Sequence, residues 1–236
     1  MVTVVFPAAG ASRRMKLRLG NVKNKNFLKL SEEFFDESIL IHTVKEFSRS
    51  EKVTFLVVVV REDEVETVEK FLRETDGLKP WVVTVGGSER QYSIANGLKL
   101  VPDDAETVLV HDAARPFADL ETIDAVIDAA EKFGGSIAAV PKKNVIKIVD
   151  KDGFVKKTLP LKTLTEVQTP QGFKKEILLR AYAKAEEDNF LGTDDASLVE
   201  RIGGKIKIVE SDYRNIKITT PEDIQKAEIY AGSLYR

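Results

Sequence analysis

The sequence predicts an α/β protein with a doubly wound, mostly parallel, Rossmann-like sheet, and three observations indicate this fold class. Between residues 2 and 140, short runs of apolar and β-branched residues alternate with stretches of helical periodicity, which is the pattern of βαβ units. One run, residues 53–60, is apolar along almost its whole length, as expected for a strand covered on both faces. Unusual loops rich in small and charged residues follow three of the runs.

Expected strands and helices follow one another in turn through this first part of the chain. In the helix expected at residues 62–75, Val65, Val68 and Leu72 recur at helical spacing, and an acidic first turn suits the helix dipole. The apolar run that begins at Val2 is bounded by Pro7, which limits the first strand. Strands are expected at residues 2–6, 53–60, 81–85, 107–110 and 136–140, and helices at residues 38–50, 62–75, 90–101 and 119–133.

From residue 141 the pattern changes to a hairpin, residues 141–168, which we call the β-arm. Two short alternating strands, residues 145–149 and 154–158, are joined by a turn that contains Asp152-Gly153, a good hairpin signal. Beyond it we expect helices at residues 174–188 and after Thr193-Asp194-Asp195, strands at 205–209 and 215–219, and a last helix that starts at Pro221. The sequence therefore predicts one domain, residues 1–236, with a protruding β-arm.

Composition excludes several classes of function. The chain has no cysteine, so disulfides, thiolate metal sites and a cysteine nucleophile are excluded. His42 and His111 are the two histidines, which leaves little for a histidine-rich metal site or a catalytic triad. The net charge of −2 gives no global positive field for nucleic acid. No apolar run has membrane-spanning length and the first residues predict a strand rather than a leader, so we expect a cytoplasmic protein with no membrane partner.

The loop after the first strand is suited to holding phosphate. Residues 7–12 read Pro-Ala-Ala-Gly-Ala-Ser, and such small side chains let main-chain N–H groups approach an anion closely. Arg13 and Arg14 follow at once, and Lys25 comes soon after. The loop is neither a Walker A sequence nor the dinucleotide fingerprint. A surface turn with a solvated arginine pair would have the same residues, so the loop needs support from elsewhere in the chain.

That support comes from two further loops at expected strand ends. Residues 86–90 follow the strand at 81–85, and residues 112–116 follow the strand at 107–110. In doubly wound sheets, ligands bind beyond the carboxyl ends of the strands. We therefore expect residues 7–14, 86–90 and 112–116 to converge on one site.

The β-arm carries an unusual charge. Between residues 142 and 162 there are seven lysines and two acids, although the whole chain is slightly negative. One interpretation is a solvated hairpin protected from aggregation. The other is an arm that reaches a phosphate, for example on a partner subunit, and the residues do not decide between the two.

Several motifs follow one another in a specific order. They are Pro7-Ala8-Ala9-Gly10 with Arg13-Arg14-Met15, Lys25, Gly86-Gly87-Ser88-Glu89-Arg90 with Ser93, His111-Asp112-Ala113-Ala114-Arg115-Pro116, Thr169-Pro170-Gln171, Thr193-Asp194-Asp195-Ala196-Ser197, and residues 215–223. Together, over residues 2–230, they resemble the 2-C-methyl-D-erythritol 4-phosphate cytidylyltransferases of the non-mevalonate route to isoprenoids. The resemblance implies a nucleotidyltransferase sheet and transfer of CMP from CTP to methylerythritol 4-phosphate, by in-line attack of the acceptor phosphate on the α-phosphorus. It also implies a divalent ion, normally Mg²⁺, and a homodimer formed through the β-arm.

The resemblance also implies roles for individual residues. Arg14 and Lys25 would stabilise the pentacoordinate transition state, and Lys217 would orient the attacking phosphate. The residues implied in CTP binding are Ala8, Ala9, Gly10, Ser12, Gly86, Gly87, Ser88, Ser93, Asp112 and Ala113. Those implied at the acceptor are Asp112, Arg115 and Lys217, and Asp112 is also the implied metal ligand. Such a transfer needs positioning and charge neutralisation rather than a protein nucleophile, which suits the residues available.

Arg90 and His111 lie close to these residues in the sequence, and for both we favour a structural role over a catalytic one. For Arg90 we favour a structural ion pair with a nearby acid. For His111 we favour packing at a strand end over a general base, because a phosphate acceptor is already ionised at neutral pH.

The chain departs from the family pattern at three places. Asn24-Lys25-Asn26 stands where the family has Pro-Lys-Gln, after a lengthened loop, so Lys23 competes with Lys25 as the second cation. Val145 and Leu161 stand where the family often has a threonine and an arginine that contact the acceptor phosphate from the neighbouring subunit. Our hypothesis is that Lys162 or Lys157 supplies the missing charge at the acceptor.

Three alternatives make different predictions. A sister cytidylyltransferase for ribitol 5-phosphate commonly has serine and valine in place of Ala113-Ala114. A nicotinamide-dependent dehydrogenase is disfavoured because no G-x-G-x-x-G follows the first strand. A non-catalytic nucleotide-binding regulator would not need Arg14 and Lys25 together.

Overall fold

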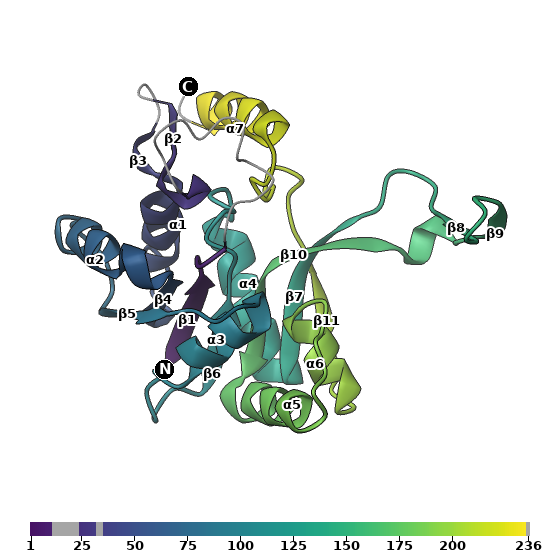
Figure 1. The fold of residues 1–236 in the computed structure, drawn as a ribbon, viewed down its shortest axis with the longest axis horizontal. Coiled ribbons are helices and arrows are strands. Elements are labelled where there is room, and N and C mark those ends of the chain that lie inside the picture. The colour runs from purple at the N-terminus through teal and green to yellow at the C-terminus, as the bar shows by residue number, and fades with distance from the viewer. Residues whose placement is uncertain (11–23, 32–34, 235–236) are drawn as a thin grey trace.

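A seven-stranded sheet runs through the middle of the molecule (Figure 1). The computed structural model describes residues 1–10, 24–31 and 35–234. The strands of this sheet are β1 (Val2–Pro7), β4 (Val53–Val60), β5 (Trp81–Val85), β6 (Thr107–Val110), β7 (Gly135–Pro141), β10 (Thr165–Lys174) and β11 (Lys207–Glu210). Their order is β11-β7-β10-β6-β1-β4-β5. Each neighbouring pair is parallel except those that β10 makes with β6 and β7, so the mostly parallel sheet is confirmed.

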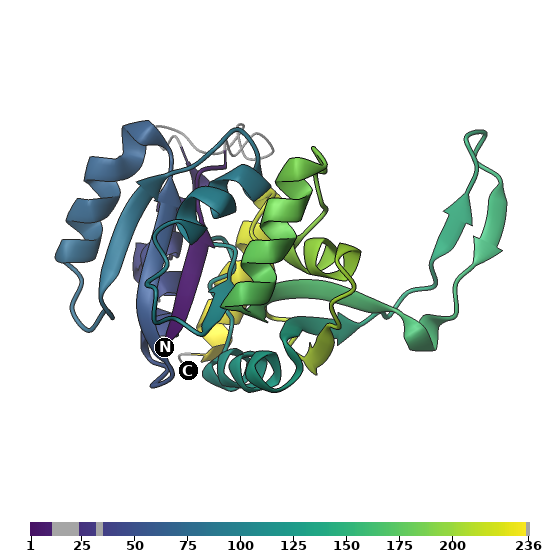
Figure 2. The same cartoon turned by 90° about the horizontal axis from the view of Figure 1, so that it is seen from below.

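Helices cover both faces of this sheet (Figure 2). On one face lie α1 (Ile39–Ser48), α2 (Val65–Arg73) and α4 (Leu120–Phe133), and on the other lie α3 (Arg90–Leu98), α5 (Lys175–Glu187) and α6 (Asp195–Arg201). Successive side chains of β1 point to opposite faces of the sheet, so this strand contributes to the core on both faces. Val4 and Phe6 pack in the core under α1, whereas Val5 packs in the core under α3. Burial on both faces explains why the central strands are apolar throughout.

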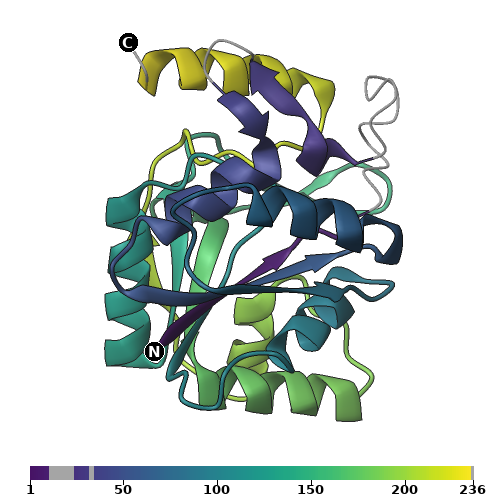
Figure 3. The ribbon, with the colours of Figure 1, turned by 90° about the vertical axis from the view of Figure 1, so that its left-hand side faces the viewer.

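The last helix and a small hairpin form an extension above the sheet. The hairpin consists of β2 (Lys29–Ser31) and β3 (Phe35–Ser38), and α7 (Pro221–Leu234) lies beside it (Figure 3). Pro221 starts α7, as predicted. A third apolar cluster joins α7 to the body through Ile218, Phe117 and Ile39. None of the helices in the described ranges combines the length and apolar character needed to cross a membrane.

The prediction of a strand at residues 215–219 is wrong. This segment has no strand pairing and instead runs along the loop after β6, where the Ile218 amide donates to the Ala114 carbonyl at 2.9 Å. Its alternating pattern has another cause: Ile218 is buried under α7, while Lys217 faces a cavity on the other side.

The β-arm projects away from the body, as Figures 1 and 2 show. Its strands, β8 (Lys147–Val149) and β9 (Val155–Thr158), pair antiparallel, and Gly153 takes the positive φ of 88° that its turn requires. The predicted hairpin is therefore confirmed, with shorter strands. The chain then returns through β10, which the sequence did not predict, because Pro170 interrupts its pattern and proline argues against an inner strand. Pairing of β10 with β7 shifts between Val167 and Gln171.

Three short 3₁₀ helices complete the described elements: η2 (Lys25–Phe27), η3 (Glu62–Glu64) and η4 (Leu161–Thr163). The first leads into β2, the second precedes α2, and the third lies at the base of the β-arm. The helix expected at residues 62–75 thus starts as η3 and continues as α2.

Candidate active site

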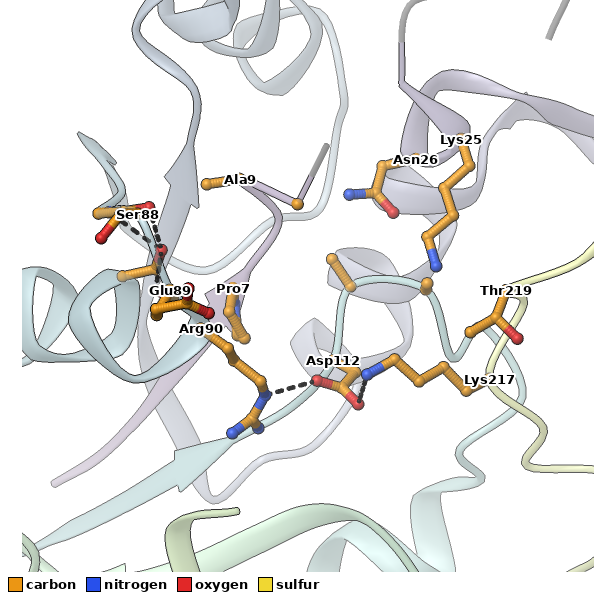
Figure 4. A pocket seen from close by; sticks show the side chains of 15 residues that line it. Pro7, Ala9, Lys25, Asn26, Ser88, Glu89, Arg90, Asp112, Lys217 and Thr219 are labelled. Atoms are coloured by element: carbon orange, nitrogen blue, oxygen red, sulfur yellow. Dashed lines mark hydrogen bonds and ion pairs between the residues drawn. The ribbon is translucent and has the colours of Figure 1, made fainter. Parts of the chain in front are cut away.

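A cavity of about 430 Å³ lies at the carboxyl ends of the parallel strands (Figure 4). The three loops that were expected to converge all contribute to it, as does the segment before α7. Its lining residues are Pro7, Ala9, Gly10, Lys25, Asn26, Gly87, Ser88, Glu89, Arg90, Ser93, Asp112, Ala113, Ala114, Lys217 and Thr219. The structure therefore brings together most of the residues that the sequence singled out.

The first loop is held in place by two asparagines. The Ala8 amide donates to the Val59 carbonyl at 2.7 Å, and the Ala8 carbonyl accepts from the side-chain amides of Asn24 (3.2 Å) and Asn26 (3.0 Å). Ala8 is therefore buried and occupied by the protein itself, and it does not line the cavity. Gly10 does line it, while Ser12 and Arg14 lie outside the described residues.

Lys25 enters the cavity from between these asparagines. Its ammonium group contacts the carbonyl of Ile218, so it lies beside the segment that carries Lys217. Asn24 also donates to both oxygens of the buried Glu64 carboxylate, at 3.1 and 3.2 Å, and burial raises the pKa of Glu64. The side-chain amides of Asn24 and Asn26 thus anchor the first loop. These two residues stand where the family has the proline and glutamine of Pro-Lys-Gln. Lys23, the competing cation, lies outside the described residues.

The second loop depends on close packing at two glycines. A Cβ on Gly86 would lie 2.5 Å from the Ala9 Cβ and 2.8 Å from the Ser93 hydroxyl, so only glycine fits between them. The Gly87 amide donates to the Ser93 hydroxyl at 3.0 Å. Gly87, Ser88 and Ser93 line the cavity, whereas Gly86 supports the loop from behind.

Asp112 is the centre of charge in the third loop. Arg90 Nε donates to its Oδ1 at 3.1 Å, Lys217 Nζ lies 2.7 Å from its Oδ2, and Arg115 Nε lies 3.7 Å from the same oxygen. Burial alone would raise the pKa of Asp112, but the three cations lower it far below its usual range. The carboxylate is therefore ionised at neutral pH, and it fixes the positions of the cations around it.

The residues implied at the acceptor differ in their positions. Lys217 lines the cavity. Arg115 is mostly buried beside it, where Nη1 donates to the Asn215 carbonyl at 2.7 Å and Nε has no hydrogen-bond partner among the described residues. Lys162 lies in η4 at the base of the β-arm and is exposed, and it does not line this cavity of its own chain.

His111 and Arg90 confirm the structural interpretations. The His111 ring is fully buried, its centroid 4.4 Å from that of Phe47, with Nε2 beside the Arg115 carbonyl (3.0 Å) and Nδ1 beside the Thr169 hydroxyl (3.1 Å). Burial lowers the pKa of His111 to about 3, so the ring is neutral near pH 7. Arg90 makes the expected ion pair with an acid, and it also lines the cavity.

Sequence reasoning missed how the Thr169-Pro170-Gln171 motif supports the site. The Asp112 amide donates to the Thr169 hydroxyl at 3.0 Å. Gln171 donates to the Asp194 carboxylate at 2.9 Å and accepts from the Ala196 amide at 3.1 Å. The motif therefore joins the loop after β6 to the start of α6. The resemblance pointed to this motif, but local spacing gives no signal for contacts between distant segments.

Asn26, Glu89 and Thr219 also line the cavity, and sequence reasoning gave them no role. Asn26 is next to Lys25 in the sequence and Thr219 is near Lys217. This proximity was the only signal that could have pointed to them. Glu89 lies inside the Gly86-to-Arg90 motif.

The site combines a backbone-lined loop with cations held at strand ends. The cavity is lined by three cations, Lys25, Arg90 and Lys217, and by two acids, Glu89 and Asp112. This excess of positive charge suits a polyphosphate. No cysteine is present, and the buried neutral His111 does not face the cavity. A sheet of this type with such a site defines a nucleotidyltransferase, which works by position and charge.

The family follows from comparison with known proteins. The model of the family described as IspD, 2-C-methyl-D-erythritol 4-phosphate cytidylyltransferase, matches residues 2–233, and the chain belongs to this family. The chain is 42% identical over 230 residues to the 2-C-methyl-D-erythritol 4-phosphate cytidylyltransferase of Caldanaerobacter subterraneus subsp. tengcongensis, covering 97% of this chain and 98% of the relative. It is 43% identical to that of Bacillus cereus, covering 98% and 97%.

Solved structures agree with this assignment. The 4-diphosphocytidyl-2C-methyl-D-erythritol synthase of Anaerococcus prevotii superposes with a TM-score of 0.86 at 29% identity, covering 98% of this chain and 96% of that one. The 2-C-methyl-D-erythritol 4-phosphate cytidylyltransferase of Thermus thermophilus gives a TM-score of 0.77 at 28% identity, covering 98% of each chain. The predicted fold class and the resemblance are both confirmed.

Proposed function

We propose that the protein transfers CMP from CTP to 2-C-methyl-D-erythritol 4-phosphate, which gives 4-diphosphocytidyl-2-C-methyl-D-erythritol and pyrophosphate. The observation that carries this proposal is the meeting of Lys25 and Lys217 at one cavity, from the two ends of the chain. Lys25 contacts the carbonyl of Ile218, 193 residues away, and both lysines line the cavity. Membership of the family supports the choice of substrates.

In the reaction, an oxygen of the acceptor phosphate attacks the α-phosphorus of CTP. The bond from that phosphorus to the oxygen that bridges to the β-phosphate breaks, and pyrophosphate leaves with the electron pair. Negative charge builds around the α-phosphorus, and Lys25 and Lys217, which both line the cavity, would offset it. Lys217 is already held by Asp112 at 2.7 Å, so little reorganisation is needed in the transition state. Arg14 joins them in this proposal by resemblance alone.

CTP would lie along the first and second loops. Ala9 and Gly10 bring backbone to the cavity, and Gly87, Ser88 and Ser93 line it next to them. Ala8 supports the first loop but has no free backbone group to offer, because its amide and carbonyl are both used within the protein. Asp112 and Ala113, on the third loop, also line the cavity and would lie beside the ribose and the phosphates.

In this proposal, Asp112 would hold a divalent ion such as Mg²⁺ together with the triphosphate. Among the described residues, no three histidine, aspartate or glutamate side chains form a metal-binding group. Mg²⁺ commonly keeps several waters and is bound through one or two carboxylates and the substrate phosphates, which is what Asp112 and a triphosphate can provide. When bound, the ion would add positive charge at the phosphates. Each carboxylate oxygen of Asp112 has more than one lone pair, so it can accept a further contact besides those with Arg90 and Lys217.

We also propose that the protein is a homodimer formed through the β-arm. The arm extends from the body (Figure 2) and exposes apolar side chains at Val145, Phe154 and Val155. In a dimer, Lys162 or Lys157 would reach the acceptor phosphate in the partner's cavity. The cytoplasmic location expected from the sequence stays a prediction.

The proposal is tested by pyrophosphate release. Each of the four nucleoside triphosphates would be combined with methylerythritol 4-phosphate or with ribitol 5-phosphate. We expect release only from CTP with methylerythritol 4-phosphate. Preference for ribitol 5-phosphate would assign the sister activity instead. Tight CTP binding with no release from any pair would indicate a non-catalytic regulator.

A further inference from the structure

A buried carboxylate behind the cavity, Asp195, has no part in the function proposed above. It is the first residue of α6, its side chain is 0% exposed, and it does not line the cavity. Removing a carboxylate from water is unfavourable unless other groups compensate for it. Two groups do so here: Nη2 of Arg90 lies 2.9 Å from Oδ2, and the Tyr182 hydroxyl donates to Oδ1 at 2.5 Å.

Tyr182 anchors this carboxylate from a second helix. It lies on α5, which packs against α6. Burial and the adjacent Asp195 carboxylate raise the pKa of Tyr182 well above its ordinary value, so the phenol keeps the proton that it donates. Asp195 is therefore fixed both by its own helix and by a donor from the neighbouring one.

Arg90 joins this buried carboxylate to the one that faces the cavity. Its Nε donates to Asp112 at 3.1 Å while its Nη2 pairs with Asp195 at 2.9 Å. A guanidinium is a rigid planar fork, so two contacts on different nitrogens fix both its position and its plane. None of the other contacts described for the chain holds the Nη2 end. Without Asp195, that end would be free to turn toward the phosphates of a bound nucleotide.

We infer that Asp195 is a positioning residue for the nucleotidyl transfer, which acts through Arg90 to set the orientation of the Asp112 carboxylate. The effect continues to the reacting groups because Lys217 Nζ lies 2.7 Å from Asp112 Oδ2. Asp195 also offsets the positive charge of Arg90, so Arg90 neutralises less of the negative charge of Asp112. That charge stays available to Lys217 and to a cation bound with the substrate. This inference rests on the proposed function, since it assigns Asp195 a part in that reaction.

Asp195→Asn tests the inference with little change in shape. Asparagine can still accept from Tyr182, but it removes the negative charge that holds Arg90. We expect kcat to fall by about 10- to 100-fold, the range found when a residue that holds a metal ligand in position is replaced. The dissociation constant of CTP, measured by calorimetry, should change less than kcat, because the substitution leaves Ala9, Gly10, Gly87, Ser88 and Ser93 of the nucleotide loops unchanged. An equal loss of affinity and no loss of kcat would contradict the inference.

An exposed carboxylate on the same helix provides a matched control. Glu200 lies on α6 and its side chain is exposed to solvent, whereas Asp194 is unsuitable because it accepts a hydrogen bond from Gln171. Glu200→Gln removes one negative charge from α6 and should keep kcat within about twofold of wild type, because surface substitutions of this kind have small effects. A similar fall in kcat for both variants would indicate a general effect on α6 and overturn the inference.

A double-mutant cycle with Arg90→Gln shows whether Asp195 acts through Arg90. If it does, Asp195→Asn lowers kcat in the wild-type background but has little further effect when Arg90 is already glutamine. Equal fold reductions in both backgrounds would refute the inference. Should Asp195→Asn fail to fold, Tyr182→Phe takes its place in the same cycle, with a smaller expected fall in kcat. A wild-type protein that releases no pyrophosphate would refute the proposed function instead.

Discussion

The cavity and the β-arm both carry many positive charges, but they hold them differently. Arg90 and Lys217 in the cavity, and Arg115 beside it, surround one buried carboxylate, Asp112. On the β-arm, most of the seven lysines between residues 142 and 162 are exposed to solvent. Charges fixed in a low-dielectric site act strongly on a transition state, whereas exposed charges are screened by water and salt. The cavity is therefore built for catalysis, and the arm is suited at most to attraction and docking.

Removing a cavity cation should have the largest effect. In Lys217→Ala, kcat for pyrophosphate release should fall by about 100- to 1,000-fold, the loss found when one fixed donor to a transition state is removed. CTP affinity, measured by calorimetry, should change far less. Lys207→Ala, which removes an exposed lysine from β11, is the control and should behave as wild type. If Lys217→Ala loses affinity but keeps its kcat, the cavity cations do not act in the transition state.

Burial beneath the cavity should also make stability depend on pH. The pKa of His111 is about 3 in the folded protein, below its unfolded value of about 6.5. Between these values the unfolded chain binds a proton that the folded protein does not, so acid favours unfolding. The free energy of unfolding should therefore fall by about 1.4 kcal/mol per pH unit between roughly pH 6 and pH 4.

Urea unfolding at several pH values checks this dependence. His111→Gln should flatten the slope, because glutamine binds no proton in this pH range. A His111→Gln protein with the wild-type slope would show that another group causes the dependence.

The smallest effects are expected on the β-arm. Lys157→Ala or Lys162→Ala should raise the KM for the acceptor only about two- to fivefold, because an exposed charge contributes less than about 1 kcal/mol. The effect should shrink further as salt is added. Lys151→Ala, at the hairpin turn, is the control. Unchanged acceptor KM in both variants would show that neither lysine replaces the charge missing at Leu161.

The sequence predicted those parts of the molecule that depend on local pattern. Alternating apolar runs and helical periodicity predicted the parallel sheet, Pro221 marked the start of α7, and a helix was expected after Thr193-Asp194-Asp195, where α6 lies. The convergence of loops at strand ends followed from the topology of such sheets. Each of these features is determined by neighbouring residues or by a general rule of the fold.

The features that the sequence did not predict depend on contacts between distant segments. We did not predict β10 because Pro170 interrupts its pattern. We wrongly predicted a strand at residues 215–219 because Ile218, which is buried under α7, gives this segment a strand-like pattern. The asparagines that hold Ala8 need Glu64 and the first loop beside them. Asp195 looked like one more residue at a helix start, and only tertiary packing shows that Arg90 and Tyr182 meet it.

The structure of the protein with CTP and Mg²⁺ bound is the measurement that tests the central claim most directly. Fixed cations at the cavity should surround the innermost phosphorus. The α-phosphate should lie within hydrogen-bond reach, about 3 Å, of the Lys25 and Lys217 side chains, with Arg14 directed into the same cavity. A triphosphate bound elsewhere, or Arg14 and Lys25 on opposite faces of the molecule, would contradict this account.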